Sequence, residues 1–124
     1  MTNVIVVDDD QANITLIKML LELDGFVVHT CTTLDEAKTK AAEDTNIFVV
    51  DYHLARGANG LDLLRAVRNG ETAAPPQTPF IITSGDYRRE KDALEAGAER
   101  FLFKPYPPES LSKEIEKLVN RNGE

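Results

Sequence analysis

Five short apolar segments alternate along the chain with stretches that carry helix signals, and this alternation limits the possible folds. The apolar segments span 3–7, 26–31, 47–51, 80–83 and 100–103. Short runs rich in β-branched residues are typical of strands that are covered on both faces, as in a parallel sheet. The pattern therefore predicts an α/β fold, an open doubly wound parallel sheet with helices on both faces.

The intervening stretches predict five helices, over 11–23, 33–42, 60–68, 86–96 and from 108 to an end within 120–124. Apolar residues recur at helical spacing in the first of them, at Ile14, Ile17, Leu20 and Leu21. Thr32 or Thr33 is expected to cap the second helix, and Glu36 has the spacing of a capping box if Thr33 is the cap. The segment 69–79 contains three prolines and one glycine, so we expect a loop there.

Polar side chains with related chemistry follow four of the five predicted strands. In a parallel sheet these strand ends share one edge, which is where ligands bind in folds of this kind. The residues at the strand ends are Asp8, Asp9 and Asp10, then Asp51, then Thr83 and Ser84, and finally Lys104 and Pro105.

Convergence of these side chains predicts metal-assisted phosphoryl chemistry. Carboxylates that lie close together repel one another unless a cation neutralises them. A few carboxylates plus water is the coordination that Mg²⁺ prefers, and Mn²⁺ accepts the same oxygen ligands. An ammonium and a hydroxyl on the other side would bind phosphoryl oxygens, with a carboxylate as the nucleophile. Asp10 is better explained as the N-cap of the first helix.

Composition excludes several other classes of protein. A formal net charge of −7 disfavours nucleic acid or an anionic membrane as a partner. Cys31 is the single cysteine and lies in an apolar segment, so we interpret it as a small buried hydrophobe in a reducing compartment. The sequence has no apolar run of membrane-spanning length and no signal-peptide pattern, so we expect a soluble cytoplasmic protein.

Four motifs resemble those of the receiver domain of two-component response regulators. They are VVDD at 6–9, VVD at 49–51, IITS at 81–84 and FLFKP at 101–105, and their order and spacing agree with that family. The resemblance covers residues 3–119. It implies a single receiver domain over 1–124 with a (βα)5 flavodoxin-like sheet in the strand order 2-1-3-4-5.

The resemblance also implies a role for each residue of the predicted site. Asp51 matches the phosphorylated aspartate. The metal ligands would be Asp8, Asp9 and Asp51, with the backbone carbonyl of His53. Thr83, Ser84 and Lys104 match the residues that bind the phosphoryl group, and the bond from Lys104 to Pro105 is expected to be cis. Phe101 matches the switch aromatic, which is expected to respond together with the α4-β5-α5 face.

The loop after Asp51 departs from the usual family pattern. Ala55 and Arg56 occupy the places where the family often has proline and glycine, and the run 55–60 is one residue longer than usual. Arg100 stands where many dimerising regulators have an acidic residue. We therefore expect a monomer in the resting state.

The expected function is that of a phosphoacceptor rather than an ordinary enzyme, although it catalyses its own phosphorylation and dephosphorylation. The expected partners are a histidine kinase or histidine phosphotransfer domain, and a downstream effector protein. An alternative is a receiver excised from a hybrid histidine kinase or a longer regulator. A flavin-binding redox module is disfavoured because a triple aspartate, rather than a phosphate-binding loop, follows the first strand.

Overall fold

A five-stranded parallel sheet forms the centre of the computed structural model, which describes residues 1–121. The strands are β1 (Asn3–Val7), β2 (Val27–Cys31), β3 (Ile47–Asp51), β4 (Phe80–Ser84) and β5 (Arg100–Phe103). They are arranged in the order β2-β1-β3-β4-β5, and every neighbouring pair is parallel. The predicted fold class and strand order are therefore confirmed.

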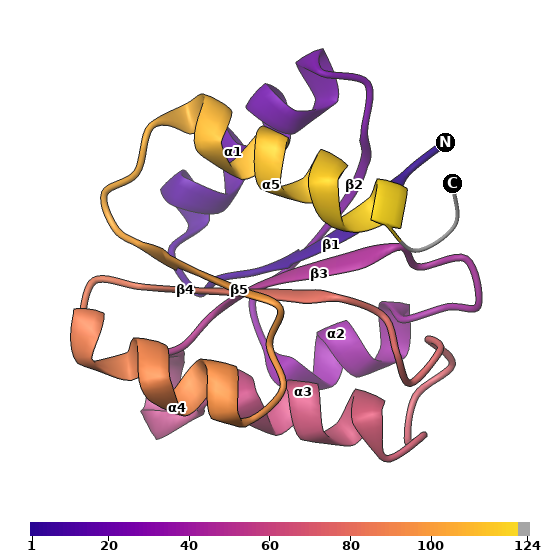
Figure 1. Cartoon of the computed structure of the whole chain (residues 1–124), viewed down its shortest axis with the longest axis vertical. Coiled ribbons are helices and arrows are strands. Elements are labelled where there is room, and N and C mark those ends of the chain that lie inside the picture. Colours follow the sequence, from indigo (N-terminus) through magenta and orange to yellow (C-terminus); the bar gives the residue numbers. More distant parts are fainter. Residues whose placement is uncertain (122–124) are drawn as a thin grey trace.

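Helices cover both faces of the sheet in two layers (Figure 1). One layer contains α1 (Gln11–Leu23) and α5 (Pro108–Arg121). The other contains α2 (Leu34–Lys40), α3 (Gly60–Arg68) and α4 (Glu90–Glu95). Two short 3-10 helices, η1 (Ala55–Gly57) and η2 (Tyr87–Arg89), precede α3 and α4. The last helix is described as far as Arg121. The sequence predicts its end within 120–124, and residues 122–124 of that range lie outside the described residues.

The strands divide their side chains between two hydrophobic cores because successive residues point to opposite faces. Val4, Val6 and Val49 pack with α1 and α5, whereas Ile5 and Val50 pack with the helices on the other face. Each of these five side chains is at most 2% exposed. Such burial on both faces explains why the three central strands β1, β3 and β4 are mostly apolar rather than alternating with polar residues.

Three helix positions differ from the sequence predictions. Helix α2 ends at Lys40 instead of continuing to residue 42, because the Thr45 hydroxyl accepts the backbone N–H of Ala42 at 3.0 Å. Helix α4 begins only at Glu90, since the chain first forms the 3-10 turn of η2. Leu20 is only partly buried and lines a surface groove, while Ile14, Ile17 and Leu21 form the buried stripe of α1.

Side-chain caps begin two of the helices as predicted. Asp10 accepts the backbone N–H of Asn13 at 3.2 Å at the start of α1. Thr33 accepts the backbone N–H of Glu36 at 3.1 Å at the start of α2. Glu36 returns a bond to the backbone N–H of Thr32 at 2.8 Å, one residue before the cap itself. These bonds satisfy backbone donors that a helix leaves without partners.

Gly60 fixes the beginning of α3 against the end of β3. Its N–H donates to the Tyr52 carbonyl at 2.8 Å. A Cβ atom at Gly60 would overlap the Asp51 carbonyl oxygen and would lie 2.8 Å from the Val50 side chain. Since both neighbours belong to a buried strand, neither can move aside easily.

We predict that Gly60→Ala lowers the free energy of unfolding by about 1–3 kcal/mol, because the added methyl group meets a rigid strand. Urea denaturation would measure the change. Gly85→Ala is the matched control, since a Cβ there meets nothing within 4 Å; it should change stability by less than about 0.5 kcal/mol. Equal stability of the two variants would contradict the proposed close contact.

Candidate functional site

The polar residues predicted from the strand ends lie at the carboxyl edge of the sheet, on the left in Figure 1. Alternation along the strands directs Asp8, Asp51 and Thr83 to the face that α1 and α5 cover, because they continue the series of Val6, Val49 and Ile81. Asp51 and Thr83 are also direct neighbours in the register of β3 and β4. The fold thus gathers these side chains on one side of one edge.

Asp8, Asp9 and Asp51 form a carboxylate cluster. One oxygen atom from each lies within 4.8 Å of the others. Asp8 is buried at 3% exposure, Asp9 is exposed, and Asp51 lies between these extremes. Carboxylate oxygens in this number, with one side open to water, fit a hard divalent cation such as Mg²⁺. The described residues therefore have the chemistry that a magnesium site requires.

Lys104 lies beside two of these carboxylates. Its ammonium nitrogen is 3.3 Å from Asp51 Oδ2 and 3.5 Å from Asp8 Oδ2. The Lys104 backbone N–H donates to the Ser84 carbonyl at 2.8 Å, which continues the pairing of β4 and β5 beyond the strand end. The following bond to Pro105 is cis. The single positive charge of Lys104 thus neutralises only part of the negative charge of the three carboxylates.

The surroundings of Asp51 disfavour the charged form of its carboxyl group. Burial raises the pKa of the Asp51 carboxyl above its ordinary value of 3.8, and the negative charges of Asp8 and Asp9 raise it further. Lys104 opposes these effects without cancelling them. Burial, together with Asp8 and Asp51, likewise raises the pKa of the nearby Tyr106 hydroxyl to about 12. This edge of the sheet therefore favours positive charge.

Asp8 is held by contacts that the sequence motifs did not reveal. Its Oδ1 accepts the backbone N–H of Asp10 at 2.9 Å, and its Oδ2 accepts the side-chain amide of Asn13 at 2.6 Å. Asn13 comes from the first turn of α1, directly after the Asp10 cap. The signal in the sequence that could have indicated this contact is an amide side chain three residues after the aspartate that caps the helix.

The loop after Asp51 returns along the strand end. His53 and Asn59 form an antiparallel bridge, whose hydrogen bonds use the flanking residues and leave the His53 carbonyl outside the pair. The His53 ring packs edge-on against Tyr52 with ring centroids 4.7 Å apart. The loop also contains η1, where Arg56 and Gly57 have φ values of 61° and 74°.

The remaining predicted residues are divided between the two faces. Thr83 and Ser84 are buried, and the Ser84 hydroxyl accepts the backbone N–H of Asp86 at 3.0 Å. Phe101 lies opposite Ile82 in the register and packs with the core beneath α2, α3 and α4. The structure therefore does not bring the Phe101 ring to the carboxylate cluster; the ring lies on the other face.

Tyr52, the residue after Asp51, connects β3 with the region of α4. Tyr52 is 7% exposed. The centroid of its ring lies 5.5 Å from the Arg89 guanidinium carbon, and its hydroxyl is 3.5 Å from Asp92 Oδ2. Arg89 is also 3.5 Å from both Asp86 and Asp92. The sequence motifs gave no indication of this contact, which joins residues about 40 positions apart.

The fold and the edge of carboxylates and lysine define a receiver-type α/β domain. The family model described as "Response regulator receiver domain" matches residues 4–116, so the chain belongs to this family. The resemblance seen in the four sequence motifs is thereby confirmed.

Individual relatives agree with this assignment. The chain is 28% identical over 123 residues to the response regulator SaeR of Staphylococcus aureus (strain USA300), covering 98% of this chain and 52% of SaeR. The chain thus spans about half the length of the curated relatives it matches.

Solved structures give the same fold. A receiver domain protein from Clostridium thermocellum has a TM-score of 0.85 and 27% identity, covering 98% of this chain and 96% of that one. A CheY-like receiver domain protein from Methanospirillum hungatei JF-1 has a TM-score of 0.85 and 25% identity, with coverage of 98% and 95%. Within residues 1–121, no helix has the length and apolar character that crossing a membrane would need.

We predict that Asp51→Asn stabilises the metal-free protein near neutral pH. The folded-state pKa of Asp51 is raised, so its charged form destabilises the fold above that pKa. This penalty disappears as the pH falls below the ordinary value of 3.8, where the carboxyl is neutral in both states. The difference between variant and wild type should therefore shrink on acidification.

Thermal unfolding in the presence of a chelator, followed over a pH series, would test this. Asp44→Asn is the control, because Asp44 is exposed and lies away from the cluster. A destabilised Asp51→Asn protein at neutral pH would show that the carboxylate is favourably solvated rather than crowded.

Proposed function

We propose that this receiver domain accepts a phosphoryl group on Asp51 in a Mg²⁺-dependent reaction. The observation that carries the proposal is the asymmetric environment of this one carboxylate. Oxygen atoms of Asp8 and Asp9 lie within 4.8 Å of an Asp51 oxygen, and the Lys104 ammonium lies 3.3 Å from Asp51 and 3.5 Å from Asp8. A nucleophilic carboxylate beside both a cation site and an ammonium is the arrangement that phosphoryl transfer needs.

Asp8, Asp9 and Asp51, with the His53 backbone carbonyl, would hold the metal. When bound there, Mg²⁺ would supply the positive charge that offsets the crowded carboxylates and the charge of the incoming phosphoryl group. The orientation of the His53 carbonyl, which its bridge to Asn59 leaves outside the hydrogen-bonded pair, supports this assignment. The His53 ring is packed against Tyr52 instead.

The chemical step transfers the phosphoryl group from a phosphohistidine to Asp51. An Asp51 oxygen attacks phosphorus, and the new P–O bond forms as the P–N bond breaks. The electron pair of the broken bond stays on the imidazole nitrogen, which is then protonated from water. Lys104, Thr83 and Ser84 bind the phosphoryl oxygens. In dephosphorylation a water oxygen attacks the phosphorus, the P–O bond to Asp51 breaks with its electron pair returning to the carboxylate, and inorganic phosphate leaves. The same residues of the domain would assist both steps.

The partners follow from this chemistry. The donor is a histidine kinase or a histidine phosphotransfer domain, and the acceptor of the signal is a downstream effector protein in the cytoplasm. Arg100 pairs within the chain with Glu114 at 2.9 Å, which supports a monomeric resting state because this arginine is already engaged. Since relatives such as SaeR are about twice as long, the domain fits both a separate receiver and a part of a longer regulator.

We predict that incubation with acetyl phosphate and Mg²⁺ adds the mass of one phosphoryl group, and that Asp51→Asn abolishes the addition. The reason is that an amide oxygen is a poor nucleophile toward phosphorus. Intact-mass spectrometry would follow the reaction, with Asp44→Asn as a folded control that still reacts. If Asp51→Asn is phosphorylated at the wild-type rate, Asp51 is not the acceptor.

To pass the signal to a partner, phosphorylation of Asp51 must alter the structure on the other face of the sheet. Thr83 lies on the face of the site, whereas Phe101 packs with the core beneath α4. The segment that links them runs from Thr83 through Asp86 into η2 and α4. Helix α4 is short, and Leu94 on it is 44% exposed, so little apolar area resists its movement.

We predict that beryllofluoride, a phosphoryl mimic, changes amide exchange in residues 83–106 in the presence of Mg²⁺. The change should include α4 and the backbone around Phe101, because both lie beyond the Thr83–Asp86 connection. Hydrogen-exchange mass spectrometry would compare the protein with and without the mimic. Asp51→Asn under the same conditions should show no response, and unchanged protection in the wild type would exclude the switch.

A further inference from the structure

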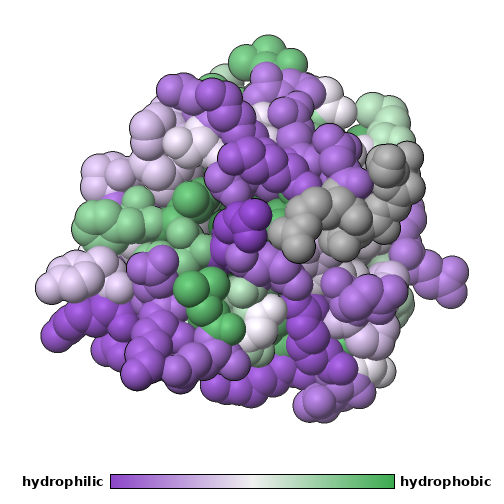
Figure 2. All heavy atoms as spheres, viewed as in Figure 1, coloured by the Kyte–Doolittle hydropathy of each residue, from purple (hydrophilic) through white to green (hydrophobic). Residues whose placement is uncertain are grey.

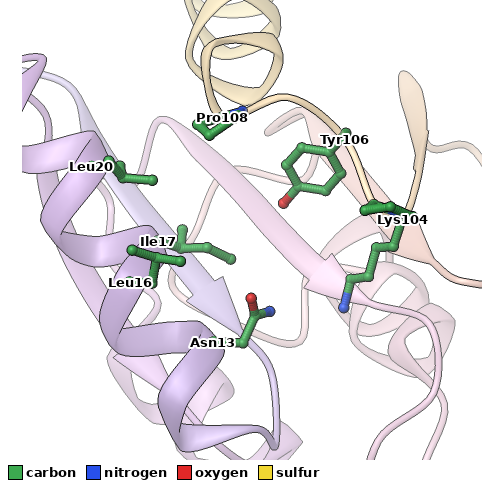
Figure 3. A pocket seen from close by; sticks show the side chains of 8 residues that line it. Asn13, Leu16, Ile17, Leu20, Lys104, Tyr106 and Pro108 are labelled. Atoms are coloured by element: carbon green, nitrogen blue, oxygen red, sulfur yellow. The ribbon is translucent and has the colours of Figure 1, made fainter.

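Asn13 stands between the carboxylate cluster and a groove on the surface. The groove has a volume of about 410 Å³ and lies between α1 and the segment 104–108. Its lining includes Leu16, Ile17 and Leu20 from α1, and Tyr106 and Pro108 from the opposite side (Figure 3). The face drawn in Figure 2 is mainly hydrophilic, with apolar patches on the side to which the strand ends point. Asn13 is thus a polar residue at the edge of a mainly apolar groove.

The contact of Asn13 with Asp8 has only one possible orientation. Asn13 Nδ2 lies 2.6 Å from Asp8 Oδ2. An ionised carboxylate only accepts hydrogen bonds, so the amide group must present its NH₂ to Asp8. The amide oxygen is therefore directed away from Asp8, toward the groove, as Figure 3 shows. A hydrogen bond to a charged acceptor at this distance is among the stronger side-chain contacts.

The backbone of Asn13 is itself held by the Asp10 cap at the start of α1. Its N–H donates to Asp10 Oδ1 at 3.2 Å, and Asp10 in turn donates its own N–H to Asp8 Oδ1 at 2.9 Å. Both oxygens of Asp8 thus accept hydrogen bonds from a single turn of chain. Because Asp8 is only 3% exposed, water contributes little to its orientation.

Lys104 competes for the same oxygen. Its ammonium nitrogen is 3.5 Å from Asp8 Oδ2, compared with 3.3 Å from Asp51 Oδ2. Without the Asn13 amide, Asp8 Oδ2 would keep Lys104 as its hydrogen-bond donor among the described residues. The side-chain contact that holds Asp8 Oδ2 would then come from Lys104 alone, and α1 would no longer fix the oxygen that Asp8 offers to a cation shared with Asp9.

We propose that Asn13 is a positioning residue for the divalent cation, because it holds the Asp8 carboxylate in the orientation that binds the metal. This inference rests on the metal site of the proposed function and extends it to a residue outside the acidic motif. Residues that orient metal ligands through hydrogen bonds typically change metal affinity about 10-fold or more when they are removed.

The test measures Mg²⁺ affinity by isothermal titration calorimetry with MgCl₂ as the titrant, and thermal unfolding without metal in parallel. Asn13→Ala removes the amide, and Asn13→Leu replaces it with an apolar side chain of similar size. We expect both variants to raise the dissociation constant about tenfold. Asp9→Asn, which removes a proposed direct ligand, provides the comparison for a larger loss.

Thr15→Ala is the matched control on the same helix. The Thr15 hydroxyl is exposed and bonds the Gln11 carbonyl at 2.9 Å, so its loss should leave the metal affinity unchanged. A purely structural role for Asn13 would lower the unfolding temperature of both variants but leave the dissociation constant of the folded protein within twofold of wild type. That result would overturn the inference. Absence of Mg²⁺ binding by the wild type would instead overturn the proposed metal site.

Discussion

Repulsion among three carboxylates at one edge of the sheet is the constraint on which the site depends. The parallel strands bring Asp8, Asp9 and Asp51 together because their ends share an edge. Asp9 is exposed to solvent, and Asp8 accepts hydrogen bonds from Asp10 and Asn13. Burial first, and then the negative charges of Asp8 and Asp9, raise the pKa of Asp51 despite the nearby Lys104 ammonium. A cation bound among these carboxylates would therefore relieve a repulsion that the fold itself imposes.

Most of the fold could be predicted because its signals are local. The bounds of β1, α1, β3, α3, β5 and the start of α5 coincide with those predicted, since apolar runs, caps and Gly or Pro signals define them within the segment itself. The ends that differ depend on competition. At α2 the Thr45 hydroxyl takes the N–H of Ala42, and at η2 the Asp86 carbonyl accepts the N–H of Arg89 three residues on. Several alternatives of similar energy exist at such ends, and sequence patterns do not rank them.

The site was predictable where it depends on strand ends and was missed where it depends on side-chain reach. Asp8, Asp9, Asp51 and Lys104 converge because of topology alone, which the alternation of strands and helices predicts. Asn13 and Tyr52 enter through side-chain contacts with Asp8 and Asp92. Phe101 illustrates the same limit, since the motif indicates its position on β5 but not that its ring packs on the face away from the carboxylates.

Within the loop after Asp51, Gly60 and the turn of η1 differ in how much change of sequence the fold tolerates. Gly60 is pressed against the end of β3, whereas η1 has a left-handed turn at Arg56 and Gly57 and buries none of its residues. Substitutions of side chains in η1 should therefore disturb the position of Asp51 less than a substitution at Gly60 does. The same loop thus combines one position where close backbone contact excludes any side chain with a short stretch where the fold leaves the choice of side chain open.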